Sequence, residues 1–273
     1  MCYFDAVARR ERWTTLLDML AADGRIEIED AAVSLAVSAA TIRRDLDELA
    51  GQQMLIRSRG GALPDSVSYD LPLRYKTSRH RDQKRRIAEV AAALVVPGGV
   101  VGLNGGTTTT EVARALALRS DLHRRPGNPG DADGTRLTVV TNALNIAHEL
   151  AIRPHVKLVV TGGVARPQSY ELIGPLALPV LEHLTLDIAV LGVDGITVAT
   201  GASTHNEGEA AVNREMASRA QKMVVVADAS KLGRSAFARI CTVTDIDVLV
   251  TDDSADPQVV SELQEAGVEV VTA

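Results

Sequence analysis

The chain has 273 residues, of which 46% are hydrophobic and 23% charged, and its formal net charge is −6 at pH 7. This length suits a small domain followed by a larger one, or one large domain, and the apolar content excludes a globally disordered chain. Only 3% of the residues are aromatic, so we expect a core of Val, Leu, Ile and Ala. No apolar run approaches the roughly 20 residues of a membrane span, and no apolar signal core follows the first charges, so we expect a cytoplasmic protein without a membrane partner.

Cysteine content and charge distribution limit the kinds of partner. Cys2 and Cys241 are too few for a disulfide framework or a four-thiolate zinc site, so we expect unpaired thiols in a reducing compartment. Residues 1–86 carry 15 Lys and Arg against 13 Asp and Glu, whereas residues 87–273 carry 14 against 22. Local patches govern contact with nucleic acid, so the overall acidity does not exclude DNA. The densest basic run, residues 74–86, is compatible with a DNA contact and equally with a solvated linker.

Two short helices are predicted near the amino terminus. Apolar residues recur at three- and four-residue spacing over residues 9–22, and Gly24 follows where a helix is expected to stop. A second helix is predicted over residues 29–36. Its expected inward residues are Ala32, Val33 and either Leu35 or Ala36.

A third helix is predicted to begin after the cap Ser38 and to bury Ile42, Leu46 and Leu49. The sequence MLIRSRGGALP follows it and predicts two short β-like pieces around a Gly-Gly turn. Three helices and such a wing form a winged helix-turn-helix, which we assign to residues 1–63.

The exposed side of the third helix carries the candidate DNA contacts. Small residues in its first turn let the backbone approach DNA, arginine can fork onto guanine, and the free amides near its cap favour a phosphate. The candidate set, with two wing arginines expected to hold adjacent DNA backbone, is Ser38, Ala39, Ala40, Thr41, Arg43, Arg44, Arg57 and Arg59. The alternative is a solvated helix in which Arg43 and Arg44 pair with Asp47 and Glu48. The preceding helix, tight turn, cap and wing together favour DNA.

The pattern changes after a polar segment at residues 64–83, which we assign to a linker. Residues 84–273 alternate strands and helices, which predicts an α/β domain with a largely parallel sheet and helices on both faces. The predicted strands are 100–104, 137–141, 156–161, 187–193, 222–228, 247–252 and 268–271, and the predicted helices include 109–118, 144–151 and 207–220. Residues 120–136 have no apolar period and are predicted to form a surface loop.

The phrase LNGGTTTTEVA, residues 103–113, follows one of these strands and opens a helix. Its two glycines permit unusual dihedrals, so the amides and threonine hydroxyls of the turn would surround an anion at the helix N-terminus. The alternative is a simple glycine turn with threonines that cap the helix. The phrase contains neither the Gly-Lys-Ser/Thr of a Walker loop nor the GxGxxG fingerprint, and we expect no cofactor and no metal.

Further polar clusters follow other predicted strands, and ligands bind at the carboxyl ends of strands in open parallel sheets. The candidate ligand-binding set is Asn104, Gly105, Gly106, Thr107, Thr108, Thr109, Asn142, Gly162, Gly163, Arg166, Asp194, Glu209 and Lys231. Its two cations would neutralise a phosphate, while Asn142, Asp194 and Glu209 would bond to sugar hydroxyls. In the structural alternatives, Asp194 only caps a turn and Lys231 pairs with Asp228.

The sequence Val-Ser-x-x-Thr-Ile-Arg-Arg-Asp-Leu at residues 37–46, followed by Arg-x-x-Gly-Gly-Ala, resembles the DeoR family of bacterial transcriptional regulators. The likeness continues through GTTT, VTN, TGG and D-x-S-K over nearly all of residues 9–252. It implies a recognition helix at residues 38–49 and a sensor domain similar in fold to ribose-5-phosphate isomerase and CoA transferases. It also implies a phosphorylated sugar or related metabolite as ligand, with its phosphate on the GTTT turn. Two positions depart from the family pattern: Arg59 stands where His is frequent, and Asn104 where Asp is common.

We therefore expect a sequence-specific repressor of carbohydrate genes that binds a double-stranded DNA operator and responds to a phosphorylated sugar. The resemblance implies a homodimer or homotetramer formed through the second domain. The rival hypothesis is a sugar-phosphate isomerase with a nucleic-acid-binding domain, which needs a positioned base and electrophile that no spacing here specifies. A third hypothesis, raised by Asn104, is a regulator that no longer binds an effector.

Overall fold

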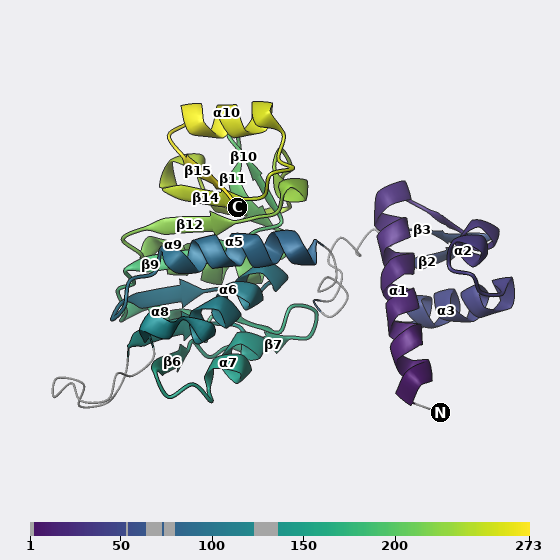
Figure 1. Ribbon diagram of the computed structural model, residues 1–273, viewed down its shortest axis with the longest axis horizontal. Coiled ribbons are helices and arrows are strands. Elements are labelled where there is room, and N and C mark those ends of the chain that lie inside the picture. Colours follow the sequence, from purple (N-terminus) through teal and green to yellow (C-terminus); the bar gives the residue numbers. More distant parts are fainter. Residues whose placement is uncertain (1–2, 53, 64–72, 74–79, 123–135) are drawn as a thin grey trace. The chain divides into compact units, whose positions relative to one another are not determined.

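The computed structural model describes residues 3–52, 54–63, 73, 80–122 and 136–273. The chain divides into two units, Met1–Arg79 and His80–Ala273 (Figure 1). Most of the predicted linker 64–83 and of the predicted loop 120–136 lies outside the described residues. The last residues assigned to that linker, from Arg81 onward, belong to a helix instead.

The first unit consists of three helices and a small antiparallel sheet. Its elements are α1 (Tyr3–Asp23), β1 (Ile26–Glu27), α2 (Ile28–Ser34), α3 (Ala39–Gly51), β2 (Ile56–Ser58) and β3 (Gly61–Leu63). The predicted inward face of the third helix is confirmed, because Ile42, Leu46 and Leu49 are fully buried against Leu16 and Leu17 of α1. Apolar burial on these faces provides most of the stability of helices this short.

The prediction for the second helix is confirmed for Ala32, and Leu35 is partly buried against the same core, but it is wrong for Val33. The buried residues of α2 are Ile28, Ala31 and Ala32, whereas the side chain of Val33 is 83% exposed. The helix ends at Ser34, two residues earlier than expected, and Ala36 adopts a left-handed conformation with φ 51°. A helix has 3.6 residues per turn, so the face that contains Ile28 cannot also contain Val33.

The wing is a three-stranded sheet in the order β1-β3-β2, and its strand β1 was not predicted. Ala62 pairs with Ile26 on one side and with Arg57 on the other. A Cβ atom on Gly61 would lie 1.7 Å from the carbonyl oxygen of Ile26. The second glycine of the predicted turn is therefore required by close contact between β3 and β1.

The second unit is built on a parallel sheet with strand order β15-β14-β12-β9-β4-β5-β6 in the described residues. All seven predicted strands are confirmed: β4 (Val100–Leu103), β5 (Leu137–Thr141), β6 (Val156–Val160), β9 (Ile188–Gly192), β12 (Met223–Val226), β14 (Val248–Thr251) and β15 (Glu269–Thr272). The helices are α5 (Arg81–Ala93), α6 (Thr107–Leu118), α7 (Leu144–Leu150), α8 (Leu178–Glu182), α9 (Glu207–Ser218) and α10 (Pro257–Glu265).

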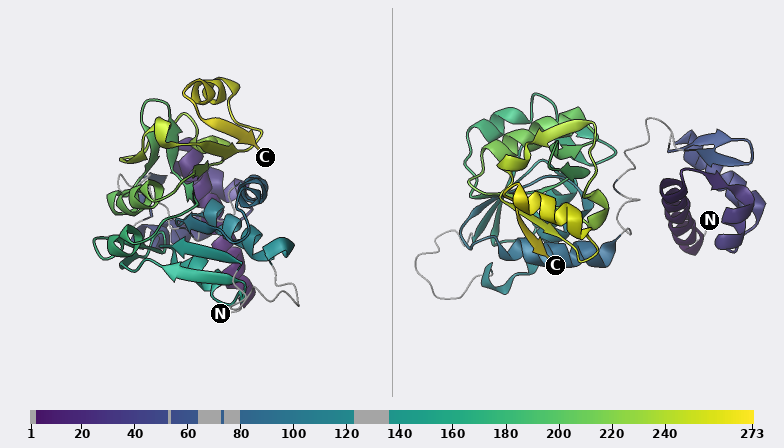
Figure 2. Two further views of the ribbon diagram at one scale, coloured as in Figure 1. Left: turned by 90° about the vertical axis from the view of Figure 1, so that its left-hand side faces the viewer. Right: turned by 90° about the horizontal axis from the view of Figure 1, so that it is seen from above.

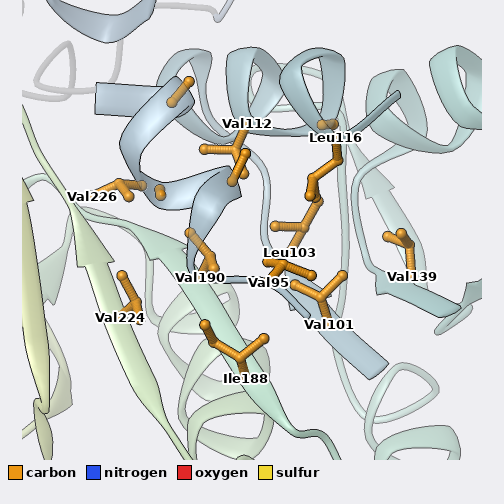
Figure 3. Close-up of a cluster of buried hydrophobic side chains, with 14 of the residues drawn as sticks. Val95, Val101, Leu103, Val112, Leu116, Val139, Ile188, Val190, Val224 and Val226 are labelled. Atoms are coloured by element: carbon orange, nitrogen blue, oxygen red, sulfur yellow. The ribbon is translucent and has the colours of Figure 1, made fainter. Parts of the chain in front are cut away.

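Helices cover both faces of this sheet (Figures 1 and 2), and alternating strand residues supply two separate cores, one on each face. Ile188 and Val190 of β9 pack under α5, α6 and α7, whereas Ala189 and Leu191 pack under α8 and α9. Figure 3 shows the first core, where side chains of α6 meet side chains of β4 and β9. Burial on both faces explains why the strands read as nearly continuous apolar runs.

Short strands beyond this sheet were not predicted. They are β7 (Val164–Arg166) and β8 (Glu171–Ile173), which form a hairpin, and β10 (Gly195–Thr197), β11 (Gly201–Thr204) and β13 (Ala238–Cys241), which form a second sheet. The segments contain three or four residues each, too few for a period to be visible in the sequence. They matter because β8 and β11 bring polar side chains to the carboxyl ends of the main sheet.

Candidate DNA interface and ligand site

Helix α3 begins as the sequence predicts. The hydroxyl oxygen of Ser38 accepts a hydrogen bond from the amide of Thr41 at 3.1 Å. Ala40, Arg43 and Arg44 are exposed, so the face opposite the core presents small residues at the start and two guanidinium groups one turn later. This is the arrangement that a helix needs to enter the major groove.

The alternative pairing of the two arginines with their own helix is not present. Glu29 of α2 lies 3.5 Å from Arg43, and Arg44 makes no ion pair with any described residue. The acids Asp47 and Glu48 pair elsewhere, with Arg57 of the wing and with Arg9 of α1. Exposed pairs such as Arg43–Glu29 contribute little to stability, so both guanidinium groups are available to a ligand.

The wing arginines differ from one another. Arg57 donates to Asp47 Oδ1 at 2.8 Å and to the carbonyl oxygen of Gly61 at 2.5 Å. It therefore ties the wing to α3, a role that the sequence did not suggest. Arg59 is exposed beside Gly60, which has φ 94° at the turn.

Asp45 is a functional residue of α3 that sequence analysis missed. Its side chain is 4% exposed and accepts hydrogen bonds from the Arg12 guanidinium and from Trp13 Nε1 at 2.8 Å. Two donors from α1 thus fix the orientation of α3 about its own axis. The acid sits on the inward face between Ile42 and Leu46, and this position was the only signal of its burial.

In the second unit, the predicted polar clusters meet at one edge because they follow five adjacent parallel strands, from β12 to β6. The sheet order reverses between β4 and β9, and such a switch point is where α/β sheets bind ligands. Asn104 lies there. It donates to the carbonyl oxygen of Gly192 at 2.9 Å and accepts from the amide of Gly192 at 2.8 Å.

The glycine–threonine turn is formed as expected, but some of its hydrogen-bond donors already have partners within the protein. The amide of Gly105 donates to Glu171 Oε1 at 2.9 Å, and the Thr109 hydroxyl is buried and donates to the Gly106 carbonyl. Gly106 has φ 143° and precedes α6. The amides of the first turn of α6, beginning with Thr107, have no preceding turn to supply carbonyl partners, so the helix itself leaves these donors unused.

Glu171 of β8 is buried in this site, although no sequence motif marks it. Besides the amide of Gly105 it accepts from Asn142 Nδ2 at 3.2 Å, and Glu209 is its acidic neighbour. Burial, followed by the charge of Glu209, raises the pKa of Glu171 to about 8. The Asn142 Oδ1 atom is buried and has no hydrogen-bond partner in the described structure.

A chain of polar contacts links the predicted cations to the predicted acids. Arg166 lies 3.2 Å from Glu209, and Lys231 lies 3.4 Å from Asp194. The Thr204 hydroxyl joins the two pairs, 3.0 Å from Asp194 Oδ2 and 3.3 Å from Glu209 Oε2. Thr204 belongs to β11 and was not predicted to take part.

The structural alternative for Lys231 is not present, and the two glycines of this edge have a role in the local backbone. Lys231 does not pair with Asp228, because the Asp228 carboxylate caps Ala229–Lys231 through the amide of Ser230. Gly162 and Gly163, with φ 78° and 119°, serve the turn into β7, and a Cβ on Gly163 would lie 2.9 Å from a backbone oxygen of β8. Among the described residues no group of three His, Cys, Asp or Glu side chains is placed to hold a metal ion.

Comparison with known proteins gives a family for each of the two units. A DeoR-like helix-turn-helix domain matches residues 12–67, and the DeoR C-terminal sensor domain matches residues 79–125 and 130–253. The chain belongs to the DeoR family. It is a DNA-binding transcriptional regulator, and the hypothesis of a sugar-phosphate isomerase is set aside. No helix in the described part of this DeoR-family protein is long and apolar enough to cross a membrane.

Relatives resemble the DeoR-family chain along almost its whole length. It is 34% identical to the putative aga operon transcriptional repressor of Escherichia coli O157:H7, covering 96% of this chain and 93% of that one. It is 36% identical to the HTH-type transcriptional regulator GlpR of Haloferax volcanii, covering 96% of each. A ribose-5-phosphate isomerase from Methanocaldococcus jannaschii matches 56% of this chain and 54% of its own, with TM-score 0.39 and 22% identity.

Proposed function

We propose that this DeoR-family regulator is a repressor of carbohydrate genes whose affinity for its operator changes when a phosphorylated sugar binds to the second unit. The observation that carries the proposal is the convergence at the carboxyl ends of β4, β5, β9 and β12. There, the unpaired amides that open α6 lie on the same edge as a linked set of carboxylates and cations. The first group suits a phosphate, and the second suits sugar hydroxyls.

The proposed DNA contacts are those of α3 and the wing turn. Ser38, Ala39, Ala40 and Thr41 would approach the phosphate backbone and base edges, and Arg43 and Arg44 would read guanine. Arg59 would hold adjacent backbone, whereas Arg57 would act by fixing the wing against α3. A homodimer or homotetramer formed through the second unit would present paired recognition helices to two half-sites.

The proposed ligand contacts follow the same division of chemistry. Thr107, the most accessible of the three threonines, and the amides after it would receive the phosphate. Arg166 and Lys231 are each paired with an acid, Glu209 and Asp194. A ligand that contacts either cation would therefore exchange with an existing ion pair. A ligand shifts operator affinity only if it binds two arrangements of the protein unequally, so these exchangeable pairs are where such a difference would arise.

The test is a thermal-shift screen of sugar monophosphates with and without operator DNA. A ligand present at 100 times its Kd adds about 2.7 kcal/mol, which raises the Tm of a unit of this size by about 5–10 °C. The Thr107→Val variant should lose most of the shift, because a partly exposed hydroxyl donor is removed at nearly equal volume. Thr272→Val on the edge strand β15 is the matched control and should keep the shift. An undiminished shift in Thr107→Val would contradict the proposed phosphate site.

A further inference from the structure

Glu171 has no role in the proposed ligand contacts, yet it shapes the turn that receives the anion. Its carboxyl group accepts from the amide of Gly105 at 2.9 Å. A Cβ atom on Gly105 would lie 2.3 Å from Glu171 Cγ, so the turn is packed directly against this side chain. Glu171 is 3% exposed, which places the contact inside the protein. The position of the turn relative to β8 is therefore fixed by one buried carboxyl group.

The second contact of Glu171 determines its chemical form. The carboxyl group of Glu209 on α9 is its acidic neighbour, and two buried carboxyl groups side by side repel one another when both are ionised. Glu209 also receives Arg166 and Thr204. Glu171 accepts only from neutral donors, so the proton belongs on Glu171.

The groups around Glu171 come from each element packed against it. Glu209 on α9 is its acidic neighbour, and Arg166 stands directly opposite Glu171 in the β7–β8 pairing. The loop after β5 and the turn before α6 supply neutral donors. Asp194, itself paired with Lys231 and capping the amide of His205, lies one hydrogen bond further away through Thr204.

We propose that Glu171 is a positioning residue that holds the anion-binding turn as a carboxylic acid, bonded to Gly105 and lying beside Glu209. The proposal rests on the ligand site proposed above. An ionised Glu171 would add a second negative charge beside Glu209 and close to the bound anion, and this repulsion would weaken anion binding. Anion binding and protonation of Glu171 therefore favour each other, and the affinity for anions falls as the pH rises through about 8.

The test uses sulfate, whose charge stays constant between pH 6 and pH 9, and measures its Kd by calorimetry on the full chain. In the wild-type protein only about one tenth of Glu171 is protonated at pH 9, so sulfate should bind about tenfold more weakly there than at pH 6. Glu171→Gln keeps both an acceptor for Gly105 and a donor for Glu209. It should bind within about twofold of wild type at pH 6 and lose the pH dependence. Glu171→Leu lacks both groups and should bind weakly at every pH.

Glu207→Gln is the control, because it removes an exposed negative charge from the same helix as Glu209 and should leave the pH profile unchanged. If the sulfate affinity of Glu171→Gln fell with rising pH as it does in wild type, the role of Glu171 alone would be overturned. The same conclusion would follow if Glu171→Gln had the wild-type Tm but did not bind sulfate at pH 6. Absence of sulfate binding by wild type at pH 6 overturns the proposed anion site, and this inference with it.

A second measurement needs no ligand. Glu171 has a raised pKa in the folded protein, so its contribution to stability is complete below its ordinary value of 4.5 and is lost as the pH rises toward about 8. The Tm of Glu171→Gln relative to wild type should therefore increase between pH 5 and pH 9. A constant difference in Tm over this range would overturn the assignment of the proton to Glu171.

Discussion

Replacing Asp45 with alanine tests how the recognition helix is held. The change removes the acceptor of two donors from α1, the Arg12 guanidinium and Trp13 Nε1. An unsatisfied buried indole N–H costs about 1–3 kcal/mol. Loss of a buried charge partner costs about 3–5 kcal/mol, but the Arg12 side chain is 18% exposed and regains part of its hydration. We expect a loss of about 3 kcal/mol in the free energy of unfolding of the first unit.

The protein offers a specific assay for this loss. Its sequence contains 1 tryptophan, Trp13, which lies in the core of the first unit, so denaturant unfolding followed by tryptophan fluorescence reports on that unit. A loss of about 3 kcal/mol is a large fraction of the 5–15 kcal/mol typical of a domain, and it should lower the denaturation midpoint markedly. The Asp45→Asn variant keeps one acceptor, so its denaturation midpoint should lie between those of wild type and Asp45→Ala.

Asp30→Ala, an exposed acid on α2, is the control and should change stability by less than about 1 kcal/mol. If Asp45→Ala unfolded within about 0.5 kcal/mol of wild type, the contacts from α1 would not be what orients α3, and the reasoning would be refuted.

Three further predictions follow from single contacts. Asn104→Asp places a carboxylate oxygen against the carbonyl of Gly192, so the second unit should lose about 1–3 kcal/mol, measured by its thermal midpoint in circular dichroism. Burial raises the pKa of Cys241 to about 11, so in a Cys2→Ser background Ellman's reagent at pH 8 should modify the native protein far more slowly than the unfolded protein. The methyl group of Gly61→Ala cannot fit without separating β1 from β3. The change should lower the denaturation midpoint followed by Trp13 fluorescence and leave the stability of the second unit unchanged. An unaltered midpoint would contradict the close contact between Gly61 and Ile26.

The main architecture could be predicted from the sequence because burial imposes a visible period. Leu46 and Leu49 lie at helical spacing, and the runs that became β9 and β12 are apolar because both faces of the sheet are covered. The clusters at the strand ends could be predicted to meet because parallel strands end at one edge. In the helix over Ile28–Ser34, Val33 was wrongly predicted to face inward because seven residues are too few to fix the phase of a helix.

The contacts within the sites could not be predicted in the same way. Glu171 and Thr204 reach the ligand site from β8 and β11, two strands too short to leave a pattern. Asp45 was overlooked because an acid on an apolar face gives no sign of its partners, which come from α1, 33 residues away. Sequence spacing identifies which residues share a face, whereas pairing between distant segments depends on the packed structure.

Operator binding by an arginine-free recognition helix tests the central claim most directly. Fluorescence anisotropy would compare wild type with the Arg43→Ala, Arg44→Ala double variant on a duplex from upstream of its own gene and on a shuffled duplex. Each guanine contact contributes about 1–3 kcal/mol, or about 5- to 150-fold in discrimination. We predict that the double variant keeps its unfolding midpoint and its weak binding to the shuffled duplex but loses its preference for the upstream duplex. A double variant that retains the wild-type preference would contradict the claim that this helix reads DNA.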